Sequence, residues 1–229
     1  MNRTHFKTLR GEVASRKTIR TEPRAVVFDF DGTLVDSMNA FADIASAVMP
    51  KHYPIDAEKA RLGYFETSGL PFFQQLEDLF PGHPANPVAA EEYEQAKVAG
   101  YFDEPLFEDA AETISKLRER GIAVIVSSNN FQHLVEEFVQ RSGIVFDMVL
   151  GFKPGFAKGA DHFRHIEKEM GISRNAITFV GDSIKDGERA ADFGITFIAK
   201  KGIFTRERFA AEFPNARVIS NLAELKTML

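Results

Sequence analysis

Two aspartates, Asp29 and Asp31, follow a short apolar run at Ala25–Phe28 near the start of the sequence. Such a run is typical of a buried strand, and side chains two positions apart in a strand project to the same side. Carboxylates at the end of a buried strand are costly unless a metal ion or hydrogen bonds compensate their charge. Because Gly32 follows, an Asp-Gly turn or helix cap is the alternative explanation. The pair is a candidate site for carboxylate chemistry.

Polar side chains also follow two later apolar runs. Ile122–Val126 leads into Ser127, Ser128, Asn129 and Asn130, and Ala176–Val180 leads into Gly181, Asp182, Ser183 and Asp186. The carboxyl ends of parallel strands meet at one edge of a sheet, where open α/β folds bind ligands. Three acids and a hydroxyl at that edge suit a hard cation with oxygen ligands, above all Mg²⁺. Capping of the next helix by Ser127, Asn129 or Asn130 is the alternative use of these side chains.

The order of these motifs resembles that of the haloacid dehalogenase-like hydrolase superfamily, in its phosphatase branch with a helical cap. Asp29–Thr33 is similar to the first family motif, D-x-D-x-[TV], and Gly181–Asp186 is similar to the last, G-D-x-x-x-D. Between them the family has a Ser or Thr after a hydrophobic strand and then a lysine. The resemblance covers about residues 24–200, and its least matched part is the helical segment after the first motif.

The resemblance implies a role for each matching residue. Asp29 is similar to the nucleophile that forms an aspartyl-phosphate. Asp31 is similar to the general acid and base, and its backbone carbonyl is expected to bind Mg²⁺ as well. Asp182 is similar to the metal carboxylate, which gives a metal site of Asp29, Asp31 and Asp182. Ser127 is expected to donate a hydrogen bond to the phosphate, and the supporting or phosphate-binding residues are Ser128, Asn129, Ser183 and Asp186.

The family lysine has two candidates in this sequence. Lys158 is preferred because it leads directly into the helix before the last motif. Lys153 is the alternative, since Lys153-Pro154 matches the Lys-Pro pattern of many relatives. Outside this context, a solvated side chain is the ordinary expectation for either lysine.

These residues need a sheet to bring them together. Strand-like runs at 25–29, 122–126, 147–150, 176–180, 195–199 and 217–219 alternate with helical patterns. This alternation predicts an α/β fold with a Rossmann-like parallel sheet and right-handed crossovers. Residues 38–104 contain helical patterns and no good strand run, so we expect a helical cap inserted after the first strand. The core then consists of residues 25–37 and 105–229, and Pro50 and Pro54 are expected to end the first cap helix.

In the family, the cap lies over the active site, excludes water and contacts the leaving group. The segment 61–69 interrupts the expected cap helices with polar residues and glycines. Arg61, Tyr64, Thr67 and Ser68 are therefore candidate substrate contacts. An ordinary loop between helices is the alternative for this segment.

Composition narrows the class of protein. The 229 residues fit one sizeable α/β domain, alone or with a smaller insert. The absence of Cys excludes disulfides and Cys-ligated zinc, and it fits a reducing, cytoplasmic setting. A formal charge of −5 argues against a general nucleic-acid binder, and no run is long enough for a membrane span.

Residues 1–24 carry a formal charge of +5, so we expect a basic N-terminal extension, packed on the body or bound to an acidic partner.

The sequence therefore predicts a Mg²⁺-dependent phosphatase that hydrolyses a small phosphorylated metabolite through an aspartyl-phosphate. One alternative is a phosphomutase of the β-phosphoglucomutase type, which protects the same intermediate from water. Another is a non-catalytic phosphate-binding protein, against which the intact acidic residues argue. A phosphonate hydrolase would need a desolvated cap lysine, and nothing marks Lys51 or Lys59 as such. The motifs specify neither the substrate nor an oligomeric state.

Overall fold

The computed structural model describes residues 23–229, so the basic extension expected at 1–24 lies almost entirely outside the described residues. The strands are β1 (Ala25–Phe28), β2 (Ala123–Phe131), β3 (Met148–Phe152), β4 (Ile177–Gly181), β5 (Thr196–Lys200) and β6 (Arg217–Ile219). The helices are α1 (Met38–His52), α2 (Ala57–Glu66), α3 (Phe72–Leu79), α4 (Asn86–Gly100), α5 (Ala110–Glu119), α6 (Gln132–Ser142), α7 (Ala160–Met170), α8 (Ile184–Phe193), α9 (Arg206–Glu212) and α10 (Leu225–Met228). Short 3-10 turns lie at Tyr101–Asp103, Arg174–Ala176 and Leu222–Glu224.

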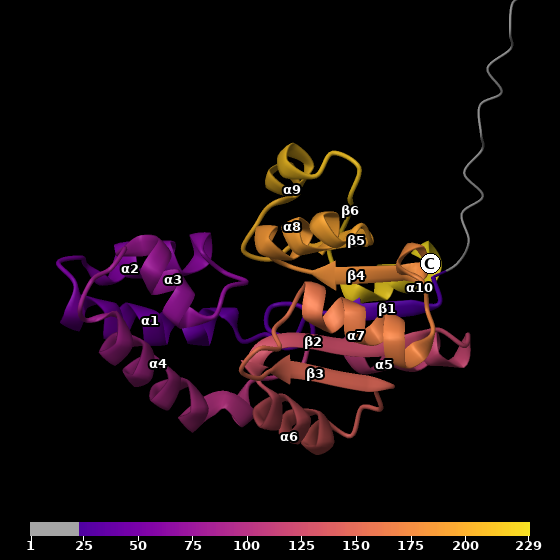
Figure 1. The fold of residues 1–229 in the computed structure, drawn as a ribbon, viewed down its shortest axis with the longest axis horizontal. Helices are drawn as coiled ribbons and strands as arrows, with labels where there is room; N and C mark the ends of the chain where they lie inside the picture. The colour runs from indigo at the N-terminus through magenta and orange to yellow at the C-terminus, as the bar shows by residue number, and fades with distance from the viewer. Residues whose placement is uncertain (1–22) are drawn as a thin grey trace, which may run out of the picture.

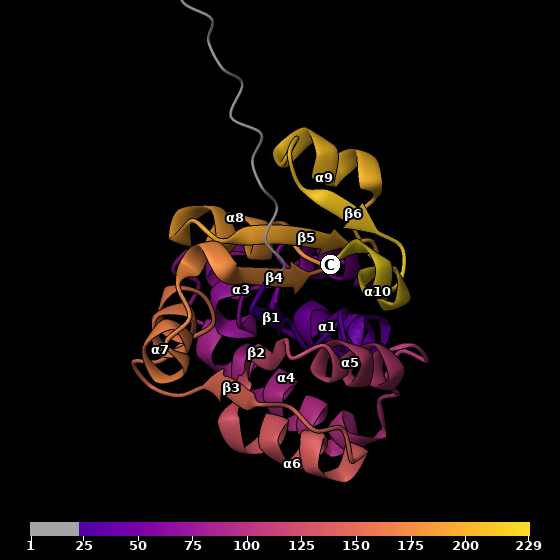
Figure 2. The same cartoon turned by 90° about the vertical axis from the view of Figure 1, so that its right-hand side faces the viewer.

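Within residues 23–229 the strands form one parallel sheet in the order β3-β2-β1-β4-β5-β6 (Figure 2). The central strand is β1, in which Phe28 lies opposite Val126 of β2 and Val180 of β4. The carboxyl ends of β1, β2 and β4 are therefore neighbours. These are the three strand ends that carry the polar motifs, so the predicted α/β fold with a parallel sheet is confirmed.

Alternating side chains of the sheet build a core on each face. Val26 and Phe28 of β1 pack on the face covered by α5, α6 and α10. Ala25 and Val27 pack on the opposite face, which α7, α8 and α9 cover. Figure 2 shows α7 on one side of the strands and α5 and α10 on the other. Both faces are apolar because a sheet buried between helices exposes no strand surface to water.

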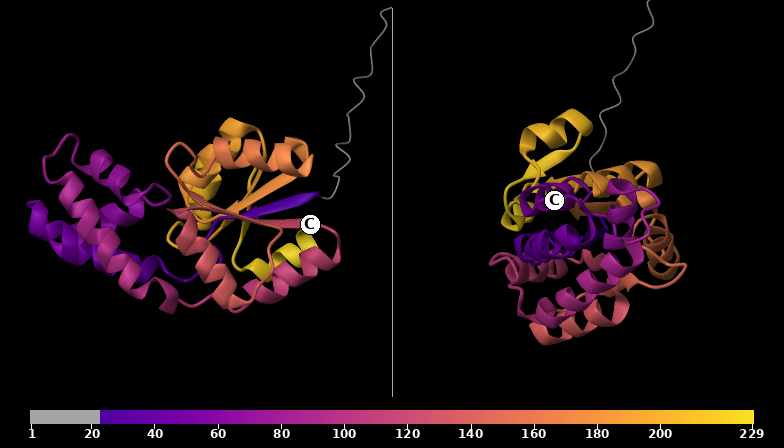
Figure 3. Two further views of the ribbon diagram at one scale, coloured as in Figure 1. Left: turned by 60° about the horizontal axis from the view of Figure 1, so that its bottom comes forward. Right: turned by 90° about the vertical axis from the view of Figure 1, so that its left-hand side faces the viewer.

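Helices α1–α4 lie together beyond one end of the sheet (Figures 1 and 3). The chain enters this group after Val35 and leaves it before Leu106, and these two residues form an antiparallel bridge. Asp36 N donates to Pro105 O over 2.8 Å, and Phe107 N donates to Leu34 O over 3.0 Å. The two connections between the helical group and the sheet therefore run side by side.

Helix α1 does not end before Pro50 as expected. It continues through Pro50 to His52, although an internal proline removes one helical hydrogen bond. The last turn is held by its neighbours, because Lys51 and His52 both contact the carboxylate of Glu92 on α4. Tertiary contacts thus outweigh the local effect of the proline.

Strand β2 is longer than expected, since it carries Ser127 to Asn130 in extended form and ends at Phe131. Its pairing with β3 is irregular between Ser127 and Phe131. Neither Asn129 nor Asn130 caps α6, whose N-cap residue is Phe131. The missing side chain of Gly151 on β3 makes room for this path, because a Cβ there would lie 2.6 Å from Gln132 Cα.

Candidate active site

Asp29 and Asp31 leave the end of β1 in different directions. Asp29 Oδ1 accepts hydrogen bonds from Phe30 N over 2.6 Å and from Lys158 Nζ over 2.7 Å. Asp31 Oδ1 accepts a bond from Ser37 Oγ over 2.8 Å, and Asp31 Oδ2 accepts one from Asn130 Nδ2 over 2.5 Å. The Asp29 carboxylate thus faces Lys158. The Asp31 carboxylate is held by Ser37, just before α1, and by Asn130, near the end of β2.

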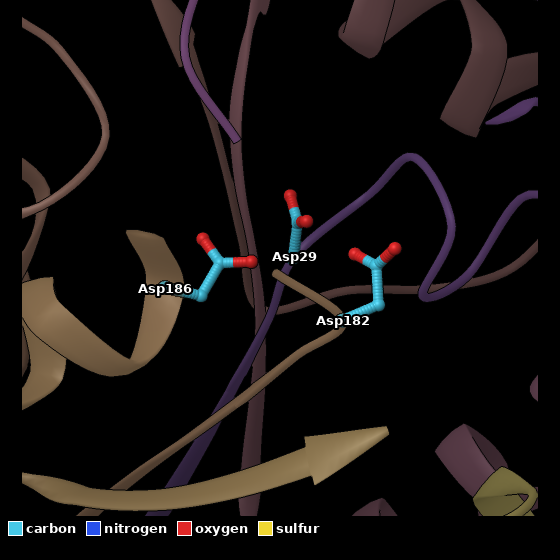
Figure 4. Close-up of side chains that lie close together, drawn as sticks. All are labelled: Asp29, Asp182 and Asp186. Atoms are coloured by element: carbon cyan, nitrogen blue, oxygen red, sulfur yellow. The ribbon is translucent and has the colours of Figure 1, made fainter. Parts of the chain in front are cut away.

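Two further carboxylates approach Asp29 from β4 and α8. Carboxylate oxygens of Asp29, Asp182 and Asp186 all lie within 4.8 Å of one another. Figure 4 shows the three side chains converging from the end of β1, from the turn after β4 and from the start of α8. Gly32 permits this approach, because a Cβ there would lie 2.1 Å from Asp182 Oδ2.

The side chain of Asp186 is held by contacts within the protein. It forms a capping box with Ser183 at the start of α8, in which Ser183 Oγ lies 2.7 Å from Asp186 Oδ2. Its other oxygen, Oδ1, lies 2.8 Å from Lys158 Nζ. Asp186 therefore supports the lysine, and it is also part of the acidic cluster.

Of the two lysine candidates, the structure brings Lys158 to the acidic cluster. Its side chain is buried between Asp29 and Asp186. Lys153 lies in an exposed turn, where its backbone pairs with Phe156. The preference for Lys158 over Lys153 therefore agrees with the geometry.

Burial and like charge dominate the electrostatics of the cluster. Burial, together with Asp186 and Asp182, raises the pKa of Asp29 well above its usual value, although Lys158 opposes the shift. Burial and Asp186 raise the pKa of Asp182 to about 7. Asp186 differs, because Lys158 and Arg189 overcome its burial and lower its pKa. Asp186 and Asp29 in turn raise the pKa of Lys158 against the effect of its own burial.

The acidic cluster fits a divalent cation with oxygen ligands. Two of its carboxylates, Asp29 and Asp182, have raised pKa values, which means that the protein alone does not compensate their charge. Lys158 is shared with Asp186 and cannot neutralise all three. The Asp31 side chain is occupied by Ser37 and Asn130, and the expected metal contact of its backbone carbonyl stays a prediction.

A cavity of about 70 Å³ adjoins the cluster. The core residues in its wall are Asp29, Asp31, Asn129, Asn130, Lys158, Asp182 and Ser183. The residues from α1–α4 and their loops are Met38, Phe41, Tyr64, Ser68, Gly69, Leu70, Pro71, Phe72, Gln75, Tyr93, Glu94 and Lys97. The helical group therefore forms the roof of the site, where the sequence places a cap.

The loop between α2 and α3 forms one of the contacts between the roof and the core. Gly69 O accepts a hydrogen bond from Asn129 Nδ2 over 2.8 Å. Gly69 has a φ of +89°, and a Cβ there would lie 2.3 Å from Ser183 Oγ. Only glycine fits such a backbone against such a neighbour, so the loop is shaped to lie directly on the site.

The four candidate cap residues divide into two pairs. Tyr64 and Ser68 line the cavity. Arg61 instead contacts Asp43 and Asn39 on α1 and lies over the ring of Phe65. Thr67 Oγ1 contacts Gly63 O and Gln75 Oε1. The structure does not bring Arg61 or Thr67 to the cavity, because helical geometry turns their side chains toward neighbouring helices.

Ser127 and Ser128 lie behind the cavity wall. Ser127 Oγ is 2.8 Å from His162 Nδ1 on the face covered by α7, and Ser128 Oγ accepts a bond from Asn130 N over 3.0 Å. Asn129 and Ser183 are the predicted phosphate-binding residues that do line the cavity. Ser127 is buried and is not among the residues that line the cavity, so the structure does not bring it to the cavity.

Two residues of the site were missed by sequence reasoning. Asn130 holds Asp31, and Lys97 of α4 donates to Asn130 Oδ1 over 3.1 Å. Lys97 had a detectable signal, since Ala89, Tyr93 and Lys97 are spaced by four and share the buried side of α4. A lysine on an apolar helix face is a better candidate for a buried site residue than a lysine in a polar loop.

Comparison with known proteins identifies the family. The model of the family described as haloacid dehalogenase-like hydrolase matches residues 23–194. A phosphoglycolate phosphatase of Synechococcus elongatus is 28% identical over 198 residues, which cover 84% of this chain and 91% of the relative. A haloacid dehalogenase-like hydrolase domain-containing protein of Arabidopsis thaliana is 31% identical over 182 residues, with 76% and 70% covered.

The fold is shared with solved structures as well. A haloacid dehalogenase-like family hydrolase from Streptococcus pneumoniae superposes with a TM-score of 0.74 at 19% identity, covering 90% of this chain and 99% of that one.

Among residues 23–229, no helix has the length and apolar character that crossing a membrane requires. From its motifs, its sheet and the matching family model, the chain belongs to the haloacid dehalogenase-like hydrolases, as an enzyme of their phosphatase branch.

Proposed function

We propose that this protein is a Mg²⁺-dependent phosphatase that hydrolyses a small phosphorylated metabolite through an aspartyl-phosphate on Asp29. The observation that carries the proposal is the buried Lys158, which lies between Asp29 and Asp186 beside a third carboxylate, Asp182. Bound Mg²⁺ would offset negative charge, so that an anionic carboxylate can approach an anionic phosphate. Asp29 and Asp182 would hold it through their carboxylates, and Asp31 through its carbonyl.

Asp29 is the nucleophile in this proposal. Both of its hydrogen bonds fall on Oδ1, so we assign the attack on phosphorus to Oδ2. The new Oδ2–P bond replaces the ester P–O bond, and the leaving oxygen takes a proton from Asp31. Burial raises the pKa of Asp31, which favours the protonated carboxyl that this step needs.

The second step regenerates the enzyme. The carboxylate of Asp31 now takes a proton from water as the water oxygen attacks phosphorus. The Asp29–P bond breaks, inorganic phosphate leaves, and Asp31 is again protonated. Lys158 stabilises negative charge on Asp29 and on the transferring group in both steps.

We assign the phosphate contacts to Lys158, Asn129 and Ser183, which line the cavity. Ser127 and Ser128 support the end of β2 behind them. Residues 38–104 act as the cap and residues 25–37 and 105–229 as the core, in the division that the sequence predicts. The cap excludes water from the intermediate and contacts the leaving group. The names of the relatives favour phosphoglycolate as a first substrate to try.

Hydrolysis of an aryl phosphate, with Mg²⁺ and with a chelator, tests the proposal. We expect Mg²⁺-dependent release of phosphate by the wild-type protein and a loss of at least about 10³-fold for Asp29→Asn, as for other covalent nucleophiles. Turnover that requires a bisphosphorylated activator would indicate a phosphomutase instead. Binding of phosphate without turnover would indicate a non-catalytic protein, and either result would contradict the proposal.

A further inference from the structure

A second buried lysine lies close to the acidic cluster, and the chemical steps above do not use it. Lys200, the last residue of β5, is 4% exposed. Its Nζ donates to Gly32 O over 2.9 Å and lies 3.5 Å from the centroid of the Phe107 ring. Both partners are uncharged, and burial lowers the pKa of Lys200 although three nearby aspartates oppose the shift. A buried ammonium with so few partners is costly, so its contacts need an explanation.

The carbonyl that Lys200 holds belongs to the turn after β1, at residues 30–35. Gly32 N donates to Val35 O over 2.8 Å, so both backbone polar groups of Gly32 are bonded. The carbonyl of Asp31 shares a trans peptide with Gly32 N, and the C=O and N–H of such a peptide point to opposite sides. The two bonds of Gly32 therefore set the direction of the carbonyl that Asp31 is proposed to offer to Mg²⁺.

The same turn contacts the carboxylate of Asp182. Thr33 Oγ1 donates to Asp182 Oδ1 over 3.3 Å. Asp182 Oδ2 lies so close to Gly32 that a Cβ on this glycine would be 2.1 Å away. Any displacement of the turn would therefore change the position of the Asp31 carbonyl relative to the Asp182 carboxylate.

Gly32 has a φ of +75°, and a glycine peptide rotates more freely than any other. A fixed partner is therefore needed to hold its carbonyl in one direction. Strand β5 supplies that partner at the right level of the sheet, since Ala199 lies opposite Gly181, and each is followed by a residue of this arrangement, Lys200 or Asp182. The ring below the ammonium, Phe107, is itself bonded to the first connection through Leu34 O.

From these contacts we propose that Lys200 is a positioning residue for the metal site. Its ammonium fixes Gly32 O, and through the turn it fixes the Asp31 carbonyl at the distance from Asp182 that a shared Mg²⁺ ion requires. The inference rests on the Mg²⁺ site of the function proposed above. Mg²⁺ demands nearly ideal octahedral geometry, which makes its binding sensitive to a small displacement of one ligand.

The position and the charge of Lys200 have opposite effects on Mg²⁺ affinity. A positive charge near the site repels a divalent cation, so a lysine that acted through its charge alone would weaken Mg²⁺ binding, and its removal would strengthen it. A lysine that positions the turn strengthens binding, and its removal weakens it. The sign of the change therefore separates the two roles.

Calorimetric titration of Mg²⁺ into the protein without substrate tests the proposal. We expect the dissociation constant to rise by about 10-fold or more in Lys200→Met, as for other residues that orient metal ligands. Lys200→Arg retains a donor for Gly32 O and should stay close to the wild type. Lys201→Met is the control for charge, because Lys201 is the exposed neighbour. Ile198→Ala is the control for stability, because it removes a buried side chain from the same strand. Both controls should keep the wild-type affinity.

Hydrogen exchange of the turn gives a second readout that does not depend on the metal. The amides of Gly32, Leu34 and Val35 are bonded within the turn, and we expect them to exchange faster in Lys200→Met than in Ile198→Ala. Unchanged or tighter Mg²⁺ binding by Lys200→Met would overturn the proposal. Weaker binding without faster exchange in the turn would overturn it too.

Hydrolysis of aryl phosphate separates this inference from the proposed function. If the wild-type protein hydrolyses the ester with Mg²⁺ and Lys200→Met binds the metal equally well, only the positioning role fails. If the wild-type protein neither binds Mg²⁺ nor hydrolyses any ester, the proposed function fails, and the positioning role fails with it.

Discussion

Lys158 Nζ lies 2.7 Å from Asp29 Oδ1, although the two residues are 129 positions apart. The same ammonium lies 2.8 Å from Asp186 Oδ1. One buried cation thus joins the end of β1 to the start of α8 and favours the charged form of the candidate nucleophile, against the effect of burial on the Asp29 pKa.

Removal of this lysine should slow every ester. We expect Lys158→Met to lower kcat at least about 100-fold on both aryl phosphate and the best metabolite, because charge on the transferring group loses its fixed partner. Lys153→Met is the control, since Lys153 is exposed, and its rates should stay within about 2-fold. Steady-state kinetics of both variants on both esters provide the measurement. A uniform loss for Lys153→Met alone would assign the family lysine to the exposed turn.

The metal requirement should depend on Asp182. In Asp182→Asn we expect the Mg²⁺ concentration for half-maximal activity to rise by about 10-fold or more and the maximal rate to fall, because a neutral amide binds a hard cation weakly. Titration of activity with Mg²⁺ gives both quantities. Isothermal titration of Mg²⁺ into the protein without substrate gives an independent readout. Identical titrations for the variant and the wild type would place the metal elsewhere.

The contact between cap and core should depend on Gly69. We expect Gly69→Ala to raise KM and lower kcat, because its Cβ would lie 2.3 Å from Ser183 Oγ and because alanine disfavours a φ of +89°. Gly82→Ala is a matched control: it lies in the cap with a φ of +66° and has open space around its Cβ. It shares the backbone strain and lacks the clash. Similar kinetics for the two variants would show that the contact does not affect turnover.

His162 should make stability fall in acid. Burial, and then the nearby charge of Lys158, lower its pKa to about 3, whereas an unfolded histidine titrates near about 6.5. Since the folded pKa is the lower one, this contribution is complete above about pH 6.5 and is lost as the pH falls toward 3. The slope should approach about 1.4 kcal/mol per pH unit within this window. Asp161 and His165 are the other titratable groups that act on His162.

Urea unfolding of the wild type and of His162→Asn at several pH values measures this effect. The difference in the free energy of unfolding between them should shrink as the pH falls from about 6.5. His165→Asn is the control on the same helix, and its difference from the wild type should not follow this curve. The slope is the readout, so a general loss of stability in His162→Asn does not affect the test. A difference that is constant with pH would contradict the prediction.

The sequence predicts the sheet and the core of the site because their signals are local. Each apolar run ends at a polar motif, and parallel pairing then brings Asp29 and Asp182 together without any further information. Lys158 can also be predicted, because a single helix separates it from the last motif and nearly fixes their spacing in the sequence. The start of helix α8 is not predicted, although Ser183 and Asp186 form its capping box, because the motif at Gly181–Asp186 is interpreted only as part of the site.

The cap could not be predicted to the same depth. Whether Arg61 or Lys97 reaches the cavity depends on how four helices pack, and that is set by contacts between residues distant in sequence. Arg61 contacts α1, whereas Lys97 follows Tyr93 by one turn on the buried side of α4. The role of Asn130 has the same origin, because its amide meets Asp31 only after β2 extends beyond its apolar run.

The paired connections at Val35 and Leu106 allow the segment between them to vary. The segment between them leaves the sheet and returns to it at adjacent points, so its length and sequence can change without altering the order of the strands. The entropic cost of such a change is small, since each doubling of a closed loop costs only about 0.6 kcal/mol. On the cap role proposed above, an exchange of this segment between relatives, with the joints placed at Asp36 and Pro105, would transfer one protein's choice of leaving group to another protein's phosphoryl chemistry.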